Sequence, residues 1–148
     1  MDGARASDEH VGGLGANPII IASERIVTGE NYGSMSALLT HWNELADYYY
    51  ENIMGCTAFI CSIDKKNKNK LNCLMIYRDL PSMDQANGVS DAKINELLLK
   101  MNPLMGPPTG HVLCDDTLIE KIKQSTGENF TFHNYTTSVG FVNVLNGE

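Results

Sequence analysis

The chain has 148 residues, a length that fits one domain whose buried core needs neither disulfides nor metals. Hydrophobic residues make up 43% and charged residues 20% of it, which is typical of a folded globular domain and excludes an intrinsically disordered chain. The formal charge of -7 disfavours nonspecific attraction to nucleic acid or to an anionic membrane. A protein with a basic surface is the expected kind of partner.

The apolar runs are too short to cross a bilayer, and the N-terminus lacks the pattern of a signal peptide. These features predict a cytoplasmic protein, with the nucleus as the alternative and no membrane partner. The cysteines lack the close paired spacing of zinc sites and of small secreted disulfide frameworks. We therefore expect buried free thiols at all four positions, Cys56, Cys61, Cys73 and Cys114.

The first half of the domain predicts a strand followed by a long helix. Residues 1–16 have little apolar content and predict a flexible tail ahead of one domain over residues 17–148. The stretch "PIIIASERIV" is rich in β-branched residues and predicts a strand. After a loop containing Gly29 and Gly33, a helical apolar stripe begins, and the helix is expected to end at Gly55. The stripe consists of Met35, Leu38, Leu39, Trp42, Leu45, Ala46, Tyr49 and Ile53.

The next segment predicts a β-hairpin. Two β-rich runs, "CTAFICSID" and "LNCLMIYRDL", flank the polar loop "KKNKNK". A turn centred on Asn67 makes Cys61 face Cys73, Phe59 face Met75 and Ile63 face Leu71 on one side, and Ile60 pair with Leu74 on the other. Because both faces of the hairpin are then apolar, we expect either interior strands covered on both sides or a second face covered by a partner.

The last third alternates helices and strands. Ser90 is the expected N-cap of a helix with a buried stripe of Ile94, Leu97, Leu98 and Met101, and Val89 is expected to pack on Ile94. Pro103 ends that helix. The strand "HVLC" follows, then a helix with a capping box at Thr117 and Glu120 and a stop at Gly127. The end of the chain, "NFTFHNYTTSVGFVNVL", predicts one or two strands.

The predicted order of elements is β-α-β-β-α-β-α-β, with an optional further strand at the end. This order indicates the α+β class: a single domain with a mostly antiparallel sheet and two or three helices, broadly like a split βαβ arrangement with a C-terminal extension.

The first glycine loop lies between a strand and a helix, where phosphate-binding loops occur. A P-loop needs one more residue between its glycines and a lysine directly before the Ser or Thr, whereas Ser34 follows Gly33 directly. The glycine spacing also differs from the dinucleotide fingerprint. We interpret the segment as a turn in which Ser34 or Ser36 caps the helix.

A second stretch, Gln85 to Ser90 in "DQANGVS", follows a strand and precedes an amphipathic helix. It resembles the acetyl-coenzyme A pyrophosphate loop of the N-acetyltransferase superfamily, whose pattern is Gln or Arg, two residues, Gly, one residue, then Gly or Ala. The resemblance implies that the amides of Gly88, Val89 and Ser90 hold a pyrophosphate at a helix N-terminus. Ser90 departs from the family's small final residue. The alternative is a polar turn before a capped helix.

Other reactive side chains do not assemble into a catalytic or metal site by sequence. His111 and Cys114 point to opposite faces of one strand, so they are not expected to meet. His41 flanks the apolar stripe of the first helix and is expected to pack there or pair with a carboxylate. We therefore predict no catalytic residues, no metal ligands and no cofactor.

Two surface features indicate a protein partner. Tyr48, Tyr49 and Tyr50 are consecutive on a helix, so at least one must point outward, and tyrosine is favoured in interfaces. Four lysines concentrate positive charge on the hairpin loop. The residues expected to bind a partner are Tyr48, Tyr50, Lys65, Lys66, Lys68 and Lys70.

These observations favour a non-catalytic α+β domain that works as a homo-oligomer or as a regulatory or assembly subunit. The first alternative is an acyl-coenzyme A-dependent N-acetyltransferase-like protein that uses the Gln85–Ser90 loop. The second is an RNA-binding domain that uses the lysine hairpin, which the acidic net charge makes the weaker candidate.

Overall fold

The computed structural model describes residues 17–28 and 32–135. The predicted N-terminal tail, the centre of the first glycine loop and the chain after Tyr135 lie outside the described residues. In the described part, the strands are β1 (Ile19–Ile26), β2 (Cys56–Ile63), β3 (Lys70–Tyr77), β4 (Thr109–Asp115) and β5 (Phe130–Tyr135). The α-helices are α2 (Tyr32–Asn52), α3 (Leu80–Gln85), α4 (Ala92–Met101) and α5 (Ile119–Thr126), with short 3-10 turns at η1 (Asn102–Leu104) and η2 (Asp116–Leu118).

The described strands form one sheet in the order β2-β3-β1-β4-β5. The first four strands are antiparallel to their neighbours, whereas β5 runs parallel to β4. The order β1-α2-β2-β3-α4-β4 is the split βαβ, or ferredoxin-like, arrangement, and α5 with β5 extends it at one edge. The predicted fold class, a single α+β domain with a mostly antiparallel sheet, is confirmed.

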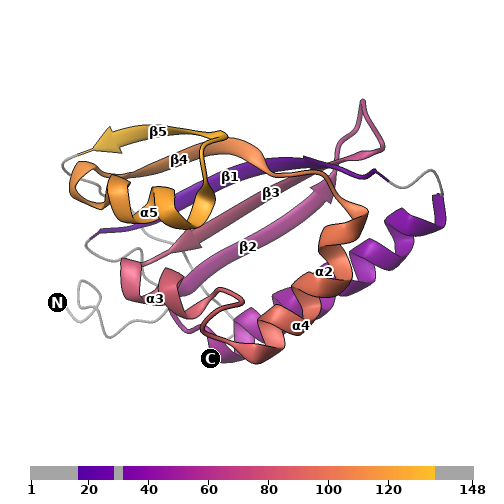
Figure 1. The fold of residues 1–148 in the computed structure, drawn as a ribbon, viewed down its shortest axis with the longest axis horizontal. Coiled ribbons are helices and arrows are strands. Elements are labelled where there is room, and N and C mark those ends of the chain that lie inside the picture. Colours follow the sequence, from indigo (N-terminus) through magenta and orange to yellow (C-terminus); the bar gives the residue numbers. More distant parts are fainter. Residues whose placement is uncertain (1–16, 29–31, 136–148) are drawn as a thin grey trace, which may run out of the picture.

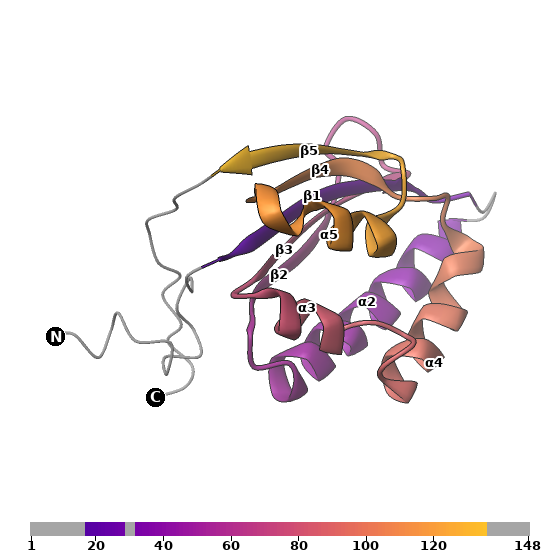
Figure 2. The same ribbon diagram turned by 60° about the vertical axis from the view of Figure 1, so that its left-hand side comes forward.

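The helices cover one face of the sheet. In Figure 1 helices α2 and α4 lie beneath β2 and β3, while α5 lies beside β4 and β5; the turned view in Figure 2 places all four helices on the same side. The core lies between these two layers. Its fully buried members include Ile19, Leu38, Leu45, Leu71, Ile94, Leu97, Met101, Val112, Cys114 and Ile122. The other face of the sheet has no helix of the described chain on it (Figure 2).

The hairpin register is the one expected from a turn centred on Asn67. Cys61 pairs with Cys73, and Ile60 pairs with Leu74. The turn is stabilised by Asp64, whose carboxylate accepts hydrogen bonds from the backbone amides of Lys66 and Asn67, both at 2.9 Å. The hairpin does not lie in the interior of the sheet, however, because β2 is an edge strand.

Four local predictions were wrong. Helix α2 begins at Tyr32, so Ser34 and Ser36 lie inside it and neither is its N-cap. Helix α3 was not expected; Asp79 caps it by accepting the amide of Ser82 at 2.8 Å. Helix α4 is capped by Asp91 rather than Ser90, and Val89 is 98% exposed, so it does not pack on Ile94. The capping box predicted at Thr117 and Glu120 is not formed: the N-cap of α5 is Leu118, with no side-chain hydrogen bond. The carboxylate of Asp115 instead caps the 3-10 turn η2 by accepting a hydrogen bond from the amide of Thr117.

Other helix boundaries agree with the sequence. Gly127 ends α5 with a positive φ of 87°, a conformation that favours glycine. Helix α4 ends at Met101, before Pro103. Helix α2 is the exception, since it ends at Asn52, three residues before the predicted stop at Gly55.

None of the described helices combines the length and apolar character needed to cross a membrane.

Gly110 on β4 lies so close to the backbone of β1 that a larger residue does not fit there. A Cβ atom there would lie 2.1 Å from the carbonyl oxygen of Ala22 and 2.7 Å from the Cα of Ser23, and neither backbone atom can move away cheaply. We expect Gly110→Ala to lower the free energy of unfolding by at least about 2 kcal/mol in urea denaturation. Gly106→Ala is the control, since its Cβ meets only ordinary contacts at 3.6 Å or more. Equal stability of the two variants would contradict this account of the β1–β4 contact.

Candidate functional site

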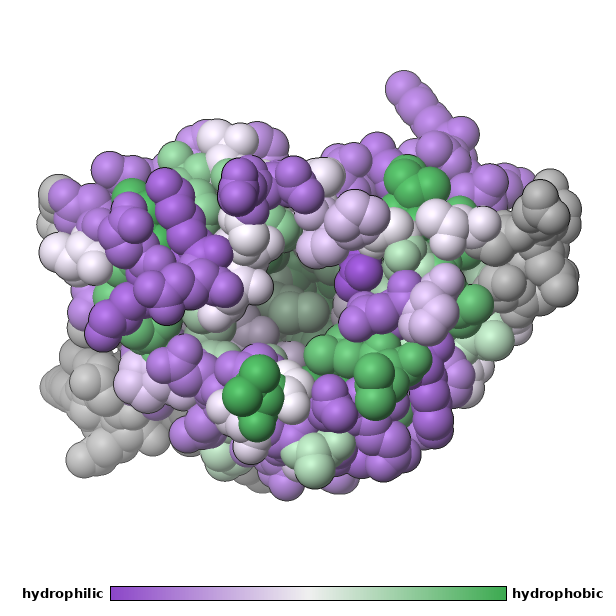
Figure 3. Space-filling model, in the orientation of Figure 1, coloured by the Kyte–Doolittle hydropathy of each residue, from purple (hydrophilic) through white to green (hydrophobic). Residues whose placement is uncertain are grey.

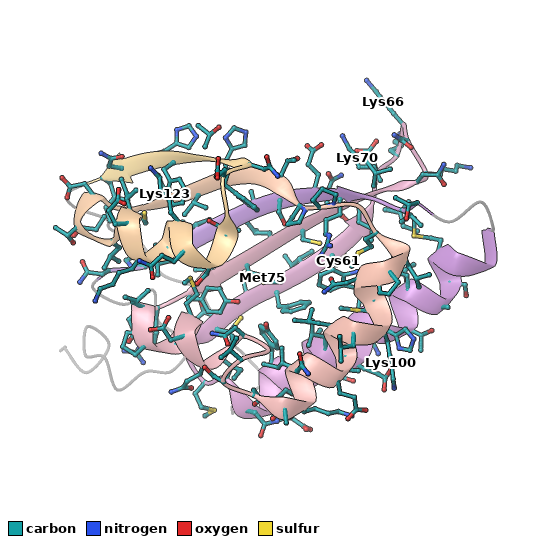
Figure 4. All side chains as sticks on the ribbon, in the orientation of Figure 1. Cys61, Lys66, Lys70, Met75, Lys100 and Lys123 are labelled. Carbon is teal, nitrogen blue, oxygen red and sulfur yellow. The ribbon has the colours of Figure 1, made fainter. Side chains whose placement is uncertain are left out.

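The candidate site is a hollow over the middle of the sheet, on the face covered by helices. The space-filling view shows a depression at the centre of the molecule with an apolar base (Figure 3). Its floor is a cross-strand row in which Phe59 on β2 pairs with Met75 on β3, and Met75 pairs with Ile21 on β1. All three side chains are only half-buried although they face the helices. We call this row, together with the neighbouring Cys61, the central hollow; Figure 4 shows Met75 and Cys61 projecting into the space between α5 and α4.

An aromatic cluster forms one wall of the central hollow. The ring of Phe59 meets Tyr49 edge to face at 4.9 Å between centroids, and meets Trp42 in the same manner at 5.8 Å. Trp42 and Tyr49 come from the buried stripe of α2, where the sequence predicted them. The Nε1–H of Trp42 is fully buried and has no hydrogen-bond partner among the described residues. Leaving such a donor unpaired costs about 1–3 kcal/mol, so buried indoles usually have an acceptor.

Two buried tyrosines add polar groups at the same wall. Tyr49 donates its hydroxyl hydrogen to the carbonyl oxygen of Ala86 at 2.8 Å, and the hydroxyl of Tyr77 lies 3.4 Å from the sulfur of Met75. Burial raises the pKa of both hydroxyls well above the ordinary value. They therefore stay protonated at neutral pH and act as neutral hydrogen-bond donors rather than as phenolates.

A pair of thiols borders the floor. The thiol of Cys73 donates to the sulfur of Cys61 at 3.3 Å, and Cys61 is half-buried whereas Cys73 is buried. Arg25 on β1 acts electrostatically on Cys73; its guanidinium donates to the carbonyl oxygen of Gly106 at 2.9 Å. The register predicted that these two cysteines face each other, but no pattern in the sequence indicated that a guanidinium lies near them.

The Gln85–Ser90 loop does not fit a pyrophosphate site. The side-chain oxygen of Asn87 already accepts the amides of Val89 and Ser90, both at 2.9 Å. The carboxylate of Asp91 accepts hydrogen bonds from the amides of Lys93 and Ile94 in the first turn of α4. Two of the three amides that the resemblance assigned to a coenzyme, those of Val89 and Ser90, are therefore occupied. The negative charge of Asp91 at the helix N-terminus also repels a pyrophosphate.

The predicted partner-binding residues are spread over two separate regions. Tyr49 is buried and Tyr50 is 56% exposed, while the hydroxyl of Tyr48 donates to Asp91 at 2.7 Å and so joins α2 to the cap of α4. The lysines Lys65, Lys66, Lys68 and Lys70 lie on the hairpin at the far end of β2 and β3, where Figure 4 shows Lys66 standing clear of the molecule. Lys70 pairs with Glu24 at 3.5 Å. The structure therefore does not bring the tyrosines and the lysines together.

The histidines of the described part of the chain lie away from the central hollow. His41 pairs with Glu44 on the surface of α2 at 3.0 Å. His111 and Cys114 lie on opposite faces of β4, as predicted: Cys114 is buried and His111 is exposed. His111 instead meets His133 of β5 at 3.0 Å between ring nitrogens. Within residues 17–28 and 32–135, no three His, Cys, Asp or Glu side chains converge as a metal site.

The fold is shared with several solved structures. MupZ from Pseudomonas fluorescens matches with a TM-score of 0.61 and 11% identity over 83% of this chain and 93% of its own. A proposed antibiotic biosynthesis monooxygenase from Caulobacter crescentus matches with a TM-score of 0.57 and 16% identity over 66% and 86%. SnoaB, a cofactor-independent oxygenase from Streptomyces nogalater, matches with a TM-score of 0.53 and 10% identity over 62% and 86%. At such low identities the likeness establishes the fold.

No protein-family model and no curated protein sequence matches this chain. The structural matches nevertheless contradict the prediction of a non-catalytic interaction, assembly or regulatory domain. The apolar sheet and the aromatic helix that prompted that prediction belong to a fold that oxygenases use. The sequence did not indicate a binding site, because the residues of the floor and the wall of the central hollow are of the types found in any hydrophobic core.

The link between Tyr48 and Asp91 makes the stability of the helix layer depend on pH. The Tyr48 hydroxyl first, and then two backbone amides, hold the pKa of Asp91 below its ordinary value. A lowered folded-state pKa contributes stability that is complete above the unfolded value of about 3.9 and is lost as pH falls through the folded value. We expect Asp91→Ala to cost about 1 kcal/mol at neutral pH and to weaken the acid-induced loss of stability.

Urea unfolding at neutral pH and below pH 4 measures this effect. Tyr48→Phe should give a smaller loss of the same pH dependence. Glu96→Ala is the control, because it removes only exposed ion pairs of α4 with Lys93 and Lys100 and should change stability by less than about 0.5 kcal/mol. An Asp91→Ala variant with the stability and pH profile of the parent would exclude the cap as a source of acid sensitivity.

Proposed function

We propose that this chain is a monooxygenase that binds a flat, largely apolar organic molecule in the central hollow and oxidises an activated CH2 group with dioxygen. One observation carries the proposal: Phe59 of the half-buried floor meets the ring of Trp42, whose buried Nε1–H has no hydrogen-bond acceptor in the described chain. The fold shared with a cofactor-independent oxygenase supports the same reading.

The hollow favours an apolar substrate with one polar edge. Ile21, Phe59 and Met75 offer apolar surface in the middle of the sheet, and covering such surface stabilises a complex by about 25 cal/mol per Å². The Nε1 atom of Trp42 is covered, so a substrate oxygen reaches it only when neighbouring side chains move aside. Accepting from it then removes the cost of the unpaired indole donor. Recognition therefore combines an aromatic or alicyclic body with a carbonyl or phenol oxygen.

The number of electrons that dioxygen takes up indicates which group of the substrate is oxidised. Dioxygen takes up four electrons when one of its atoms becomes water and the other becomes a carbonyl oxygen. Conversion of a CH2 group to C=O supplies all four, so the balanced reaction needs no separate reductant: the substrate and dioxygen give the ketone and water. A CH2 group next to a carbonyl or between aromatic rings is the kind that loses a proton readily enough to react.

The protein's part is to stabilise the anion formed when that proton leaves. Trp42 is an uncharged donor on one wall, whereas the hydroxyl of Tyr77 already donates to the sulfur of Met75. A donor held in place in an apolar site stabilises a developing oxyanion more than water does. The four residues that define the hollow, Ile21, Phe59, Cys61 and Met75, carry no carboxylate or imidazole. In this proposal the substrate proton passes to solvent, and the site lowers the barrier through the indole donor.

The test uses anthrone, a tricyclic ketone with a CH2 group between two aromatic rings. We expect the protein to speed oxygen uptake above the spontaneous rate and to yield a product that carries one labelled oxygen atom from ¹⁸O₂. Trp42→Phe keeps an aromatic ring against Phe59 but lacks the N–H donor, and kcat/KM should fall at least about tenfold. Its free energy of unfolding should change by less than about 1.5 kcal/mol.

Tyr50→Phe is the matched control, since it removes a hydroxyl from an exposed position of α2 and should leave the rate unchanged. Oxygen uptake that equals the spontaneous rate with anthrone and with related acidic ketones would refute the proposed activity. Unchanged kinetics in Trp42→Phe would refute the role of the indole donor even if the activity is present.

We also propose that a second copy of the chain covers the open face of the sheet, the side chains opposite the helices. Two cross-strand rows make its centre apolar: Ile60, Leu74 and Ala22 form one, and Ala58, Ile76, Ile20 and Leu113 form the other. Ile60 is 55% exposed and Leu113 is 39% exposed. An uncharged apolar patch lets two acidic chains meet, and a twofold contact places the same patch on both sides.

A nucleic-acid partner fits this face poorly. RNA-binding domains of the split βαβ type stack bases on aromatic side chains of the central strands. The central strands here present Ile20, Ala22, Leu74 and Ile76 on the open face. The net charge of -7 opposes binding further.

The dimer is tested at Ile60. Ile60→Glu places like charges in a twofold contact, and we expect the species seen by size exclusion with light scattering to change from dimer to monomer. Leu99→Glu is the control, because Leu99 is 66% exposed but lies on α4, in the helix layer. A parent protein that is monomeric at high concentration would refute the proposal.

A further inference from the structure

The second chemical feature of the hollow is the thiol pair on its border, which the proposed oxygenase reaction does not use. Cys61 and Cys73 are directly opposite each other on β2 and β3. Hairpin pairing sets their geometry: the amide of Asp64 donates to the carbonyl oxygen of Lys70, which makes that pair a hydrogen-bonded one, and the pairs alternate from there. Cys61 and Cys73 therefore occupy a non-hydrogen-bonded position, where the two Cα atoms lie about 4.5 Å apart.

That spacing is within the range that a disulfide bridges, about 4.4–6.8 Å between Cα atoms. The two sulfurs are already 3.3 Å apart, so side-chain rotation without movement of the strands brings them into bonding distance. No other pair of described cysteines shares this arrangement. Cys56 contacts the carbonyl oxygen of Ala58 instead, and Cys114 lies on β4, at the other side of β1.

We propose that Cys61 and Cys73 form a dithiol site that reduces organic hydroperoxides bound in the central hollow and becomes a disulfide in doing so. Cys61 is the half-exposed thiol beside Phe59, so it is the sulfur that a molecule in the hollow reaches. Cys73 is buried behind it and serves as the resolving thiol. The proposal does not rest on the oxygenase activity and is tested without it.

The electrostatics of the pair agree with these roles. The S–H of Cys73 donates to Cys61, which lowers the pKa of Cys61, and the same hydrogen bond together with burial raises the pKa of Cys73. The positive charge of Arg25 opposes that increase at Cys73. The thiolate is the reactive form of cysteine, so the exposed member of the pair is the nucleophile.

The reaction balances with two thiols and one hydroperoxide. The Cys61 thiolate attacks the terminal oxygen of the hydroperoxide; the O–O bond breaks and the alcohol leaves with a proton. Cys61 is then a sulfenic acid. The Cys73 thiol attacks its sulfur, the S–S bond forms, and water leaves. Overall, the two sulfurs lose two electrons and the hydroperoxide becomes an alcohol and water. A dithiol reductant restores the pair.

The apolar surroundings select among peroxides. Phe59 and Met75 border the approach to Cys61, and these side chains favour a hydroperoxide with an aromatic or aliphatic body over hydrogen peroxide. The remaining thiols are poor competitors. Burial raises the pKa of Cys56 to about 11, and burial likewise raises the pKa of Cys114.

The experiment treats the reduced full-length protein with one equivalent of cumene hydroperoxide or of hydrogen peroxide. With cumene hydroperoxide we expect two of the four thiols to disappear, and the intact monomer to lose two hydrogens in mass. Trypsin cuts at the hairpin lysines between the two cysteines, and chymotrypsin cuts after Phe59, which separates Cys56 from Cys61. The peptide that contains Cys73 should therefore remain joined to the peptide that contains Cys61, and not to the one that contains Cys56, until a reductant is added. The reaction should be at least about tenfold faster than with hydrogen peroxide.

Variants assign the roles. Cys73→Ala should stop at a sulfenic acid on Cys61 that dimedone traps, and Cys61→Ala should abolish the fast reaction. Cys56→Ala is the matched control on the same strand and should react like the parent. Peptide mapping of the parent protein decides the question even if a variant fails to fold. Four thiols left after treatment, or a disulfide that joins any other cysteines, would overturn the site, and equal rates with both peroxides would overturn the proposed substrate class.

Discussion

The position of β1 at the centre of the sheet is the constraint on which the rest of the structure depends. It pairs antiparallel with β3 on one side and with β4 on the other. Because side chains alternate along a strand, this double register sends Ile19, Ile21 and Arg25 toward the helices and Ile20 and Ala22 toward the open face. A slip of one residue would exchange these two sets, and both the hollow and the apolar outer rows would be lost. The close contact of Gly110 with β1 holds that register in place.

The sequence determined much of the fold because its patterns were long or local. The stripe of α2 repeats over five turns. The two halves of the hairpin meet at a short polar loop, and a turn centred on Asn67 predicts the pairing of Cys61 with Cys73 that the structure has. Short elements were harder. Helix α3 has six residues and begins at Leu80, and its N-cap Asp79 and its Pro81 are residues that also suit a turn. At α4 both Ser90 and Asp91 are good caps, and only the fold selects Asp91.

The candidate site could not be recognised in the same way, because none of its residues is unusual by type. Phe59, Met75 and Ile21 have the apolar character of core residues, and the property that marks them is partial exposure at positions where full burial is expected. Exposure depends on how far apart α4 and α5 lie over the sheet, which no local pattern encodes. Trp42 illustrates the same limit: helical periodicity predicted its burial, whereas the lack of an acceptor for its Nε1–H depends on tertiary packing, which includes its contact with Phe59 of β2.

The two proposed functions use opposite faces of the sheet: substrate binding and chemistry use the helix-covered face, and assembly uses the open face. The helix-covered face holds the reactive groups in a low-dielectric space, where neutral donors and a thiol pair have strong effects on a bound molecule. The open face carries apolar side chains and no catalytic group in the arrangement proposed here, so a second copy can cover it without blocking the hollow. The charged residues lie at the ends, as with Glu24 and Lys70 near the hairpin. Because β1 contributes alternate residues to both faces, binding in the hollow and assembly through the sheet depend on the same register of the same strand.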